Sequence, residues 1–272
     1  MTDRNAVLGN PIGHSKSPLI HAAFAKQTHQ DISYEAILAP VNDFAGTVNR
    51  LVAEGYKGVN VTVPFKFEAY NLCKVADSNG SLSVRAISSG SGAVNTLSFL
   101  NRNQMHGDNT DGVGLRNDLE KNLDFVLADK NILILGAGGA AHGVLNSLLS
   151  AKSITIANRT PQKALDMVFG VYNANAKVFD ELDEPFDLII NATSAGLTDS
   201  VLPIPDSIFT SNTLAYDMMY GRETPFMVQA RSAGAQVADG LGMLVEQAAE
   251  AFSIWRGVKP DTKPVIATIR AL

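Results

Sequence analysis

The sequence predicts an α/β fold built as two domains. Short runs of β-branched residues alternate with segments in which apolar residues recur every three or four positions, the pattern of parallel sheets covered by helices. Near the middle of the chain a glycine-rich turn joins such a run to a helical segment. The length of 272 residues suits about two domains, each of which can bury its own core.

The alternating pattern assigns each segment in turn. The β-branched runs predict strands over residues 5–9, 32–38, 58–63, 94–100, 131–135, 153–157, 187–191, 214–217 and 236–238. Helical spacing predicts helices over 18–29, 42–54, 65–75, 112–122, 139–151, 161–170, 225–233, 241–256 and 261–270. A Ser- and Gly-rich stretch, 77–92, interrupts the alternation and predicts a long mobile surface loop.

The composition places the chain among ordinary globular proteins. It is 46% hydrophobic and 18% charged. It has no apolar stretch near the roughly 18 residues that span a bilayer and no N-terminal signal pattern, so we expect a cytoplasmic protein. A net charge of −5 without a Lys/Arg run argues against nucleic acid and anionic membranes as main partners. Any anionic ligand must then be met by local charges.

The cysteine and histidine content argues against a metal centre. Cys73 is the single cysteine, which rules out a disulfide framework and a cysteine-clustered metal site. Its place in a helical pattern predicts a small buried side chain. His14 and His21 are too isolated to propose as metal ligands.

The strongest local signal is NILILGAGGAAHGVLNSLL, residues 131–149. A buried strand runs directly into Gly136, Gly138 and Gly139, followed by Ala141 and an apolar helix. Glycines at these positions let the backbone approach a pyrophosphate at a helix N-terminus, and alanine is a permitted last residue of this dinucleotide fingerprint. A tight turn without a ligand, or a loop that binds adenosylmethionine, would need similar residues, so the segment alone leaves these alternatives open.

The next predicted strand ends in residues that favour NADP over NAD. An NAD site places Asp or Glu about 20 residues beyond the glycines, whereas here the chain reads Asn158, Arg159, Thr160, with Lys163 one turn later. Cationic side chains and a hydroxyl suit a 2′-phosphate, which a carboxylate would repel. The structural alternative is a Thr160 N-cap before Pro161, with Arg159 merely solvated.

The segment GVNVTVPFKFEAY, residues 58–70, places a lysine where a helix disfavours it. Asn60 and Thr62 share one face of the predicted strand, and they either meet water at a strand edge or form the wall of a polar site. Lys66 follows at the C-terminal end of the strand, where ligands bind in open α/β sheets. In a first helical turn the peptide dipoles oppose an ammonium by roughly 0.3–1 kcal/mol. The structural alternative is an exposed, solvated side chain, which is usual for lysine.

A carboxylate that could hold Lys66 occurs in MHGDNTDGVGLRNDLEK, residues 105–121. Asp108 and Asp111 both come just before a predicted helix. Asp111 is either the partner of Lys66 or an N-cap, a structural role worth about 1 kcal/mol.

Two serines near the N-terminus, in GNPIGHSKSPLIHAAF, form a third polar segment. Ser17 precedes Pro18, which predicts an N-cap with proline at the first helical position. Ser15 has no such structural role. Hydroxyls and free helix-end amides together make a small anion site suited to a carboxylate.

These segments together closely resemble the shikimate dehydrogenases, which reduce 3-dehydroshikimate to shikimate with NADPH in aromatic amino-acid biosynthesis. The resemblance runs from about residue 7 to about residue 257, and its motifs occur in family order. They are GNPIGHSKSP, GVNVTVPFK, GAVNT at 92–96, GDNTDGVG at 107–114, GAGGAA, ANRT, INATSAG at 190–196, YDMMY at 216–220 and DGLGMLVEQA at 239–248.

The resemblance implies a role for each matching residue. Lys66 and Asp111 would form the catalytic acid/base pair. Substrate contacts would come from Lys66, Asp111, Ser15, Ser17, Asn60, Thr62, Asn95, Tyr220 and Gln247, with Thr193 lining the same cleft. NADP(H), the implied cofactor, would contact Gly136, Ala137, Gly138, Gly139 and Ala140 at its pyrophosphate, Asn158, Arg159, Thr160 and Lys163 at its 2′-phosphate, and Met218 and Gly240 near its nicotinamide. The implied reaction requires no metal.

The resemblance also implies the domain organisation. An N-terminal α/β substrate domain would comprise residues 1–111, to which the C-terminal helices 241–272 return. A doubly wound, Rossmann-type NADP-binding domain would comprise residues 112–240. The chain would act as a monomer or homodimer.

The sequence departs from the family pattern at three places. The stretch 77–92 is longer than we expect of the family, so any family cofactor contact there cannot be transferred. Lys163 stands where arginine is frequent, which keeps the charge but loses bidentate geometry toward a phosphate. His142 stands where a basic residue is common. We therefore expect preference for NADP with reduced affinity.

Two other functions remain open for a chain of this kind. One is a quinate/shikimate dehydrogenase of broader substrate or cofactor range, and the other is a non-catalytic NADP-binding module. The serine pair at Ser15 and Ser17 and the absence of an acidic residue in ANRT favour the shikimate enzyme, and the presence of both Lys66 and Asp111 favours catalysis.

Overall fold

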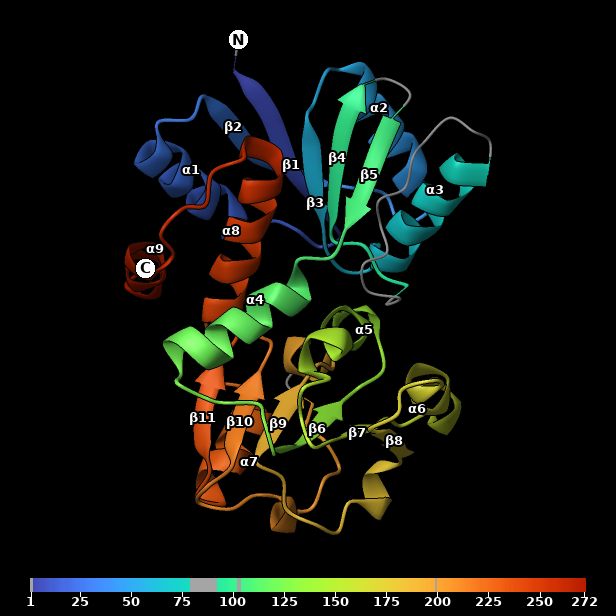
Figure 1. The fold of residues 1–272 in the computed structure, drawn as a ribbon, viewed down its shortest axis with the longest axis vertical. Helices are drawn as coiled ribbons and strands as arrows, with labels where there is room; N and C mark the ends of the chain where they lie inside the picture. The colour runs from blue at the N-terminus through green and yellow to red at the C-terminus, as the bar shows by residue number, and fades with distance from the viewer. Residues whose placement is uncertain (1, 79–91, 102–103, 199) are drawn as a thin grey trace. The chain divides into compact units, whose positions relative to one another are not determined.

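The computed structural model describes residues 2–78, 92–101, 104–198 and 200–272. The chain forms two compact units: the first unit is Met1–Leu115 with Leu244–Leu272, and the second unit is Arg116–Met243. Each unit contains its own β-sheet (Figure 1). The sequence predicts a substrate-binding domain over residues 1–111 with 241–272 and an NADP-binding domain over residues 112–240. This division by ligand stays a prediction. Most of the stretch 77–92, predicted as a mobile loop, lies outside the described residues.

The first unit is built on a five-stranded sheet in the order β2-β1-β3-β4-β5. Its strands are β1 (Asp3–Gly9), β2 (Ile32–Leu38), β3 (Gly58–Val61), β4 (Thr96–Asn101) and β5 (Gln104–Asp108). Its helices are α1 (Ser17–Thr28), α2 (Phe44–Ala53), α3 (Lys66–Ser78) and α9 (Lys263–Arg270), together with most of α4 (Asp111–Asn117) and α8 (Leu241–Arg256).

This sheet is mixed rather than parallel throughout. Strands β1, β2 and β3 are parallel, but β4 runs antiparallel to β3 and β5 antiparallel to β4. Strand β5 is not predicted from the sequence, because its five residues, QMHGD, contain no β-branched side chain. The expectation of parallel sheets is therefore wrong for this edge of the first unit.

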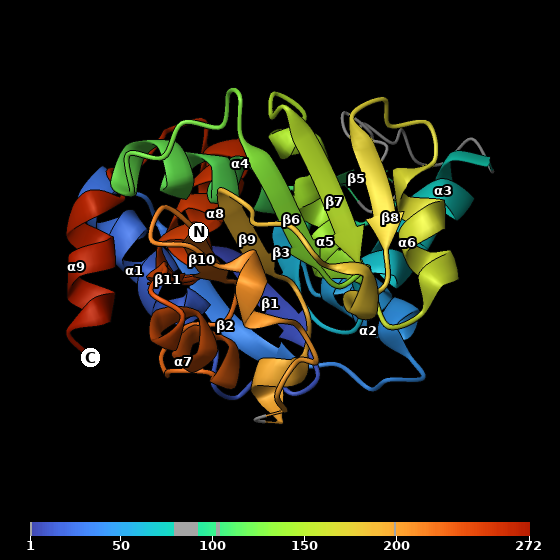
Figure 2. The ribbon, with the colours of Figure 1, turned by 90° about the horizontal axis from the view of Figure 1, so that it is seen from below.

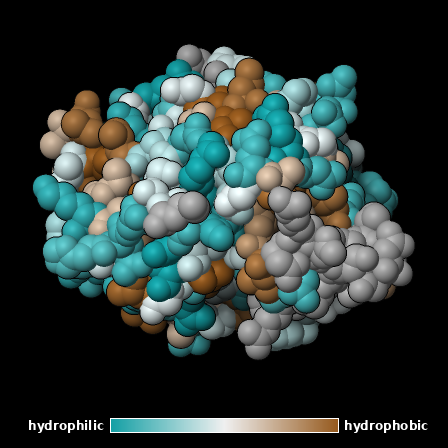
Figure 3. All heavy atoms as spheres, turned by 90° about the horizontal axis from the view of Figure 1, so that it is seen from above, coloured by the Kyte–Doolittle hydropathy of each residue, from teal (hydrophilic) through white to brown (hydrophobic). Residues whose placement is uncertain are grey.

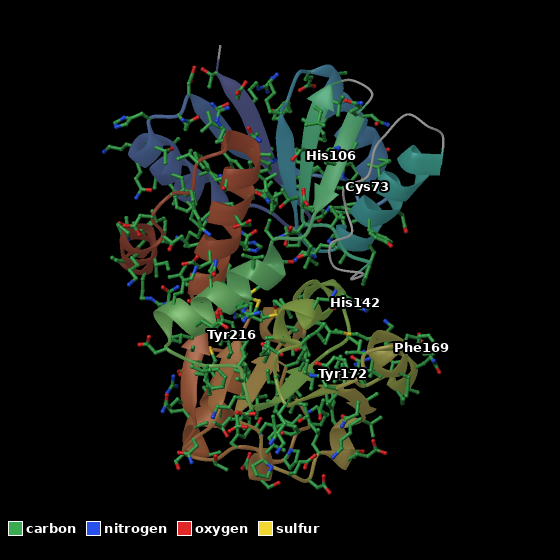
Figure 4. All side chains as sticks on the ribbon, in the orientation of Figure 1. Cys73, His106, His142, Phe169, Tyr172 and Tyr216 are labelled. Atoms are coloured by element: carbon green, nitrogen blue, oxygen red, sulfur yellow. The ribbon has the colours of Figure 1, made fainter. Side chains whose placement is uncertain are left out.

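Helices α2 and α3 cover one face of the first sheet, opposite α1 and α8 (Figure 1). Phe44 of α2 stacks on Phe65, just before α3, with ring centroids 4.9 Å apart. Cys73 of α3 lies in the same core, beside β5 (Figure 4). Its predicted burial is confirmed, and that burial raises the pKa of its thiol to about 12.

An aromatic cluster fills the core on the opposite face of the sheet. It joins His21 and Phe24 of α1, Tyr34 of β2, and Phe252 and Trp255 of α8. The His21 and Tyr34 rings are stacked, with centroids 3.9 Å apart and planes 5° apart. Burial lowers the pKa of His21 to about 3, so its imidazole is neutral at physiological pH.

The second unit has a six-stranded parallel sheet in the order β11-β10-β9-β6-β7-β8 (Figure 2). Its strands are β6 (Asn131–Leu135), β7 (Ser153–Ala157), β8 (Ala174–Lys177), β9 (Leu188–Asn191), β10 (Leu214–Asp217) and β11 (Gln236–Asp239), and its helices include α5 (Gly139–Leu145), α6 (Pro161–Val168) and α7 (Pro225–Ser232). The chain winds outward from β6 in one direction and then returns to build the other half. This order is the doubly wound, Rossmann-type arrangement that the sequence predicts.

Two features of the second unit differ from the prediction: strand β8 was not expected, and one helix was expected over 112–122. Strand β8 reads ANAK, which lacks the β-branched residues that mark the inner strands. Helix α4 instead ends at Asn117 and continues as a π-helical turn, Asp118–Asn122. There the buried Asp118 accepts a hydrogen bond from Tyr216 at 2.7 Å.

The helices of the described ranges are not suited to cross a membrane, because none of them combines the length and apolar composition needed to span a bilayer. On the face shown in Figure 3, hydrophobic residues form patches separated by hydrophilic ones.

The buried His21 makes the stability of the fold depend on pH. Its pKa is about 3 in the folded state and about 6.5 when unfolded, so the unfolded state binds more protons between these values. The contribution to stability is complete above pH 6.5 and falls, as pH decreases toward 3, by up to about 1.4 kcal/mol per pH unit.

We predict that His21→Gln flattens this dependence. Urea unfolding at pH 7 and pH 5.5 should show wild type losing more stability than His21→Gln, whose side chain does not titrate. An exposed control, His14→Gln, should behave as wild type. An equal loss in wild type and His21→Gln would contradict the burial of a neutral imidazole.

Candidate active site

Lys66 is the first residue of α3 and lies at the C-terminal end of the β3 segment. The turn between the two elements closes with a hydrogen bond from the Phe65 amide to the Thr62 carbonyl oxygen, at 3.0 Å. Phe65 is fully buried and anchors this turn in the α2/α3 core. The local sequence therefore fixes Lys66 at a helix start, as predicted.

Lys66 and Asp111 form a largely buried ion pair. The Lys66 Nζ lies 2.5 Å from Asp111 Oδ2. The Lys66 side chain is 13% exposed and the Asp111 side chain 7%. In such surroundings each charge needs the other, because an unpaired buried charge is strongly unfavourable. The pairing answers why a lysine is tolerated at this helix start.

Asp111 begins α4, but it does not cap the helix. Its own backbone amide donates to the side chain of Asn109, with Oδ1 at 3.0 Å. The Asn109 amide group in turn donates to the Ala93 carbonyl oxygen at 2.8 Å. The alternative of Asp111 as an N-cap is therefore wrong, since Asn109 takes that local role and leaves the carboxylate to Lys66.

The second oxygen of Asp111 is held by Asn95. The Asn95 Nδ2 donates to Asp111 Oδ1 at 2.9 Å and to Thr110 Oγ1 at 3.0 Å. Gln247, on α8, accepts from Thr110 Oγ1 at 3.3 Å and from Asn95 Nδ2 at 3.4 Å. The structure thus brings four of the predicted residues together: Lys66, Asp111, Asn95 and Gln247.

Gly114 explains how α8 can approach this group so closely. A side-chain carbon added at Gly114 would lie 2.6 Å from Gln247 Cβ and 2.8 Å from its backbone nitrogen. Only a residue without a side chain leaves room for this contact.

The serine pair lies at the start of α1, and Ser15 rather than Ser17 makes the local bond there. Helix α1 begins at Ser17, and its N-cap position is Lys16, without a side-chain cap. The Ser15 hydroxyl instead accepts from the Ser17 amide at 3.3 Å. The prediction that Ser17 caps the helix is wrong, and Ser15 has the local structural role it was thought to lack.

The sheet register brings the serine segment and Thr62 to the same edge. β1 and β3 are parallel neighbours with Leu8 opposite Val61, so both strands end at this edge. Gly9 packs against Thr62, whose methyl carbon would lie 2.6 Å from a side-chain carbon at Gly9. Asn60 lies two residues before Thr62 and is buried. Its side-chain amide bonds to Tyr34, to the Asn95 carbonyl oxygen and to Thr96.

The second unit contains the predicted glycine turn. Gly136 follows β6 with φ = 101°, a conformation that favours glycine. A side-chain carbon there would lie 3.1 Å from the Thr193 methyl carbon, and one at Gly138 would meet nothing within 4 Å. Gly138 precedes α5, so the backbone at this turn is open to a ligand. Ala137, Gly139 and Ala140 complete the turn and the start of α5.

The predicted 2′-phosphate residues follow the neighbouring strand. β6 and β7 pair with Leu135 opposite Ala157, which places Gly136 and Asn158 at adjacent strand ends. The Asn158 side chain donates to the Thr160 carbonyl oxygen at 2.9 Å. Thr160 takes the N-cap position of α6, but its side chain makes no capping bond and stays available.

Arg159 and Lys163 are both exposed. Among the described residues neither forms an ion pair. Two unpaired cations beside a glycine turn attract a phosphate, and the segment 157–163 contains no acidic residue that would repel it.

A buried polar network that the sequence analysis missed orders the ends of β9 and β10. Asp217 accepts from Asn191 at 3.1 Å and from Thr224 at 2.5 Å, and Asn191 accepts from the Thr193 hydroxyl at 2.7 Å. The Met219 amide also bonds to Asp217 at 2.9 Å. The network fixes the loops after both strands. Its signal was present as polar residues ending two apolar runs.

The remaining predicted residues lie in these loops of the second unit. Met218 and Gly240 are in direct contact, because a side-chain carbon at Gly240 would lie 2.4 Å from the Met218 carbonyl oxygen. Tyr220 follows β10 and is half-buried.

In the described part of the chain, no cluster of three or more His, Cys, Asp or Glu side chains is suited to a metal ion.

The two units thus offer different chemistry. The first presents an ammonium paired with a carboxylate beside amide and hydroxyl groups, which suits proton transfer to a polar substrate. The second presents a glycine turn at the switch point of a doubly wound sheet, with cations on the next strand, which suits a phosphorylated dinucleotide.

Three family models match the chain. The shikimate dehydrogenase substrate binding domain model matches residues 7–97. The shikimate / quinate 5-dehydrogenase model matches residues 118–198. The shikimate 5'-dehydrogenase C-terminal domain model matches residues 240–270.

Individual proteins resemble the chain along its whole length. A shikimate dehydrogenase (NADP(+)) from Methylobacillus flagellatus is 57% identical, covering 99% of each chain. An Ael1 enzyme from Pseudomonas putida, covering 98% of each chain, has a TM-score of 0.88 at 40% identity. The shikimate 5-dehydrogenase of Thermus thermophilus, solved with NADP(H) and shikimate, has a TM-score of 0.84 at 33% identity, covering 100% of each chain. The chain therefore belongs to the shikimate dehydrogenase family.

Proposed function

We propose that this chain catalyses the reversible, NADP-dependent interconversion of 3-dehydroshikimate and shikimate. The observation that carries the proposal is the buried Lys66–Asp111 pair, whose lysine lies inside the region matched by the substrate binding domain model. Curated relatives of high identity are named shikimate dehydrogenase (NADP(+)). The glycine turn and the cations of the second unit support the choice of cofactor.

Lys66 is the group that handles the proton. NADPH, when bound, supplies the hydride that reduces the ketone. The oxygen of that ketone gains negative charge, and the Lys66 ammonium donates a proton to it, while in the oxidation direction the neutral amine takes the proton from the alcohol. Asp111 holds the ammonium in place through its Oδ2 atom.

We assign the polar groups at the same sheet edge to substrate binding. Ser15 and Ser17 would bind the substrate carboxylate, with the hydroxyls near the start of α1. Thr62, Asn95 and Gln247 would contact ring hydroxyls, and Tyr220 of the second unit would contribute as well. These contacts rest on the family resemblance and on the clustering of Asn95 and Gln247 around Asp111.

The two units would divide the ligands between them. Residues 1–111 with 241–272 would form the substrate-binding domain, and residues 112–240 the NADP-binding domain. The pyrophosphate would lie on the turn Gly136–Ala140, the 2′-phosphate near Asn158, Arg159, Thr160 and Lys163, and the nicotinamide near Met218 and Gly240. The open backbone at Gly138 supports this placement.

The chain would work in the cytoplasm as a monomer or homodimer, without nucleic acid as a partner. Its net charge of −5 supports the last point, because nucleic-acid binding requires clustered cations. A broader activity on quinate is the second candidate, since one matching family model covers shikimate and quinate dehydrogenases alike.

Replacement of Lys66 tests the reaction. NADP reduction followed by absorbance should show turnover with shikimate exceeding that with quinate. Lys66→Ala should lower kcat by about 10²-fold or more with little change in KM, because the proton transfer acts in the transition state rather than in substrate binding.

Two further variants sharpen the test. Lys66→Arg keeps the positive charge but cannot release a proton at working pH, so it should be as inactive as Lys66→Ala. Lys152→Ala, at an exposed lysine, should match wild type. Near-normal kcat in Lys66→Arg would exclude Lys66 as the proton donor, and faster turnover of quinate with NAD would favour the second candidate function.

Cofactor choice depends on the exposed cations of the second unit. Replacing Arg159 and Lys163 together with Gln should raise the KM for NADP by about tenfold or more, because a charge-assisted hydrogen bond contributes about 1.5–3 kcal/mol. The KM for NAD should change little, since NAD lacks the 2′-phosphate. Equal losses with both cofactors would refute the assignment, and Lys152→Gln serves as the matched charge control.

A further inference from the structure

A line of buried polar side chains leads from the aromatic cluster of the first unit to the Lys66–Asp111 pair. It passes from Tyr34 on β2 to Asn60 on β3, then to Thr96 on β4 and to Asn95 just before it. Asn60, Thr96 and Asn95 are all buried. These residues come from three strands of one sheet: β3 and β4 are neighbours, and β2 is separated from β3 by β1.

The direction of the hydrogen bonds at Asn95 is fixed by a backbone group. The Thr110 amide lies 2.8 Å from the Asn95 side chain, and a peptide N–H can only donate, so the atom it meets is the carbonyl oxygen Oδ1. The NH₂ group of Asn95 must then face the other way, toward Asp111 Oδ1 at 2.9 Å. The Asn95 side chain cannot flip without losing both bonds.

A second backbone group fixes Asn60. Its Nδ2 lies 3.2 Å from the Asn95 carbonyl oxygen, which can only accept. The same NH₂ group donates to the Thr96 hydroxyl at 3.0 Å. The Thr96 hydroxyl uses its one hydrogen toward Asn95 Oδ1, also at 3.0 Å, which is nearer than its other polar neighbour, Thr110 Oγ1 at 3.4 Å.

Tyr34 closes the line at its far end. Because Asn60 Oδ1 is an acceptor, the Tyr34 hydroxyl must donate to it, at 2.7 Å. The Tyr34 ring is held by its stack on the buried His21. Every donor therefore points the same way, from Tyr34 through Asn60, Thr96 and Asn95 to the carboxylate of Asp111.

We propose that Thr96, with Asn60 and Tyr34 behind it, is a positioning residue for the catalytic pair: together with the Thr110 amide, the one-directional line of hydrogen bonds commits the Asn95 amide to Asp111 Oδ1 and so leaves Oδ2 facing Lys66. This proposal rests on the proposed function and deepens it. It gives Asn60 a role inside the protein, in place of the substrate contact that the resemblance implies.

A purely structural role is the competing explanation, since buried polar groups need partners wherever they lie. The two explanations differ in what a lost bond should change. If the line only satisfies buried groups, removing the Thr96 hydroxyl lowers stability and leaves the folded enzyme fully active. If it orients Asp111, the folded enzyme itself becomes slower.

The test compares Thr96→Val, which keeps the shape and loses the hydroxyl, with Thr96→Ser, which keeps the hydroxyl. Thr96→Val should lower kcat by about tenfold while KM for shikimate changes by less than about threefold, and Thr96→Ser should recover at least about half of wild-type kcat. Tyr34→Phe keeps the ring on His21 and should give a smaller loss, because it acts from the far end. Thr47→Val, at another buried threonine whose hydroxyl donates to the carbonyl oxygen of Asp43, the N-cap of α2, should leave kcat unchanged.

A second readout requires no turnover. The rate at which an amine-reactive reagent modifies Lys66, followed by peptide mass spectrometry, should rise in Thr96→Val and stay at the wild-type value in Thr96→Ser and Thr47→Val. Absent turnover by wild type would refute the proposed function, and the labelling rates would still test the line of hydrogen bonds.

Equal kcat and equal labelling in Thr96→Val and Thr96→Ser would overturn the proposal. A loss of kcat in Thr96→Val that is fully explained by the fraction of unfolded protein would also overturn it. If Thr96→Val does not fold, Tyr34→Phe carries the same two measurements, and wild-type kcat and labelling in that variant would also overturn it.

Discussion

The ion pair between Lys66 and Asp111 is the interaction on which the proposed site depends. Both side chains are largely withdrawn from water, and removal of either would leave the other charge buried without a partner, which is strongly destabilising. Lys66 also begins a helix, where the peptide dipoles oppose its charge. Asp111 offsets that opposition, so the carboxylate both stabilises the helix start and holds the group proposed to transfer the proton.

The fold makes this pair possible by bringing distant segments to one sheet edge. β1 and β3 end side by side, which places Gly9 and Asn10, at the start of the serine segment, beside Thr62 and Val63. The chain segment 93–95 joins this edge through a bond from the Val94 amide to the Lys66 carbonyl oxygen. Asp111 arrives after β5, oriented by Asn95 and Asn109. In the second unit the strand order also brings distant segments together, because β6 and β7 are neighbours and the glycine turn and the Arg159 segment follow their adjacent ends.

Most of this arrangement could be predicted from the sequence where the signal is local. The glycine turn, the ANRT segment and the buried Cys73 follow from short patterns with a direct physical meaning. Strands β5 and β8 could not be predicted, because short edge strands lack the β-branched runs of inner strands. The local role of Ser15 was not predicted, because a serine two residues before a helix can also bond the amide of its first residue. The line from Tyr34 to Asn95 could not be found either, because its bonds join residues far apart in the sequence.

The pairing of Lys66 with a negative charge is the central claim, and Asp111→Asn tests it most directly because it removes the charge while keeping the size of the side chain. The measurement is the rate of NADPH formation in a single turnover, with shikimate affinity measured in parallel. We predict a rate lower than wild type by about 10²-fold or more, with affinity changed by less than about threefold. A rate within about threefold of wild type would contradict the claim that Asp111 holds the reacting lysine.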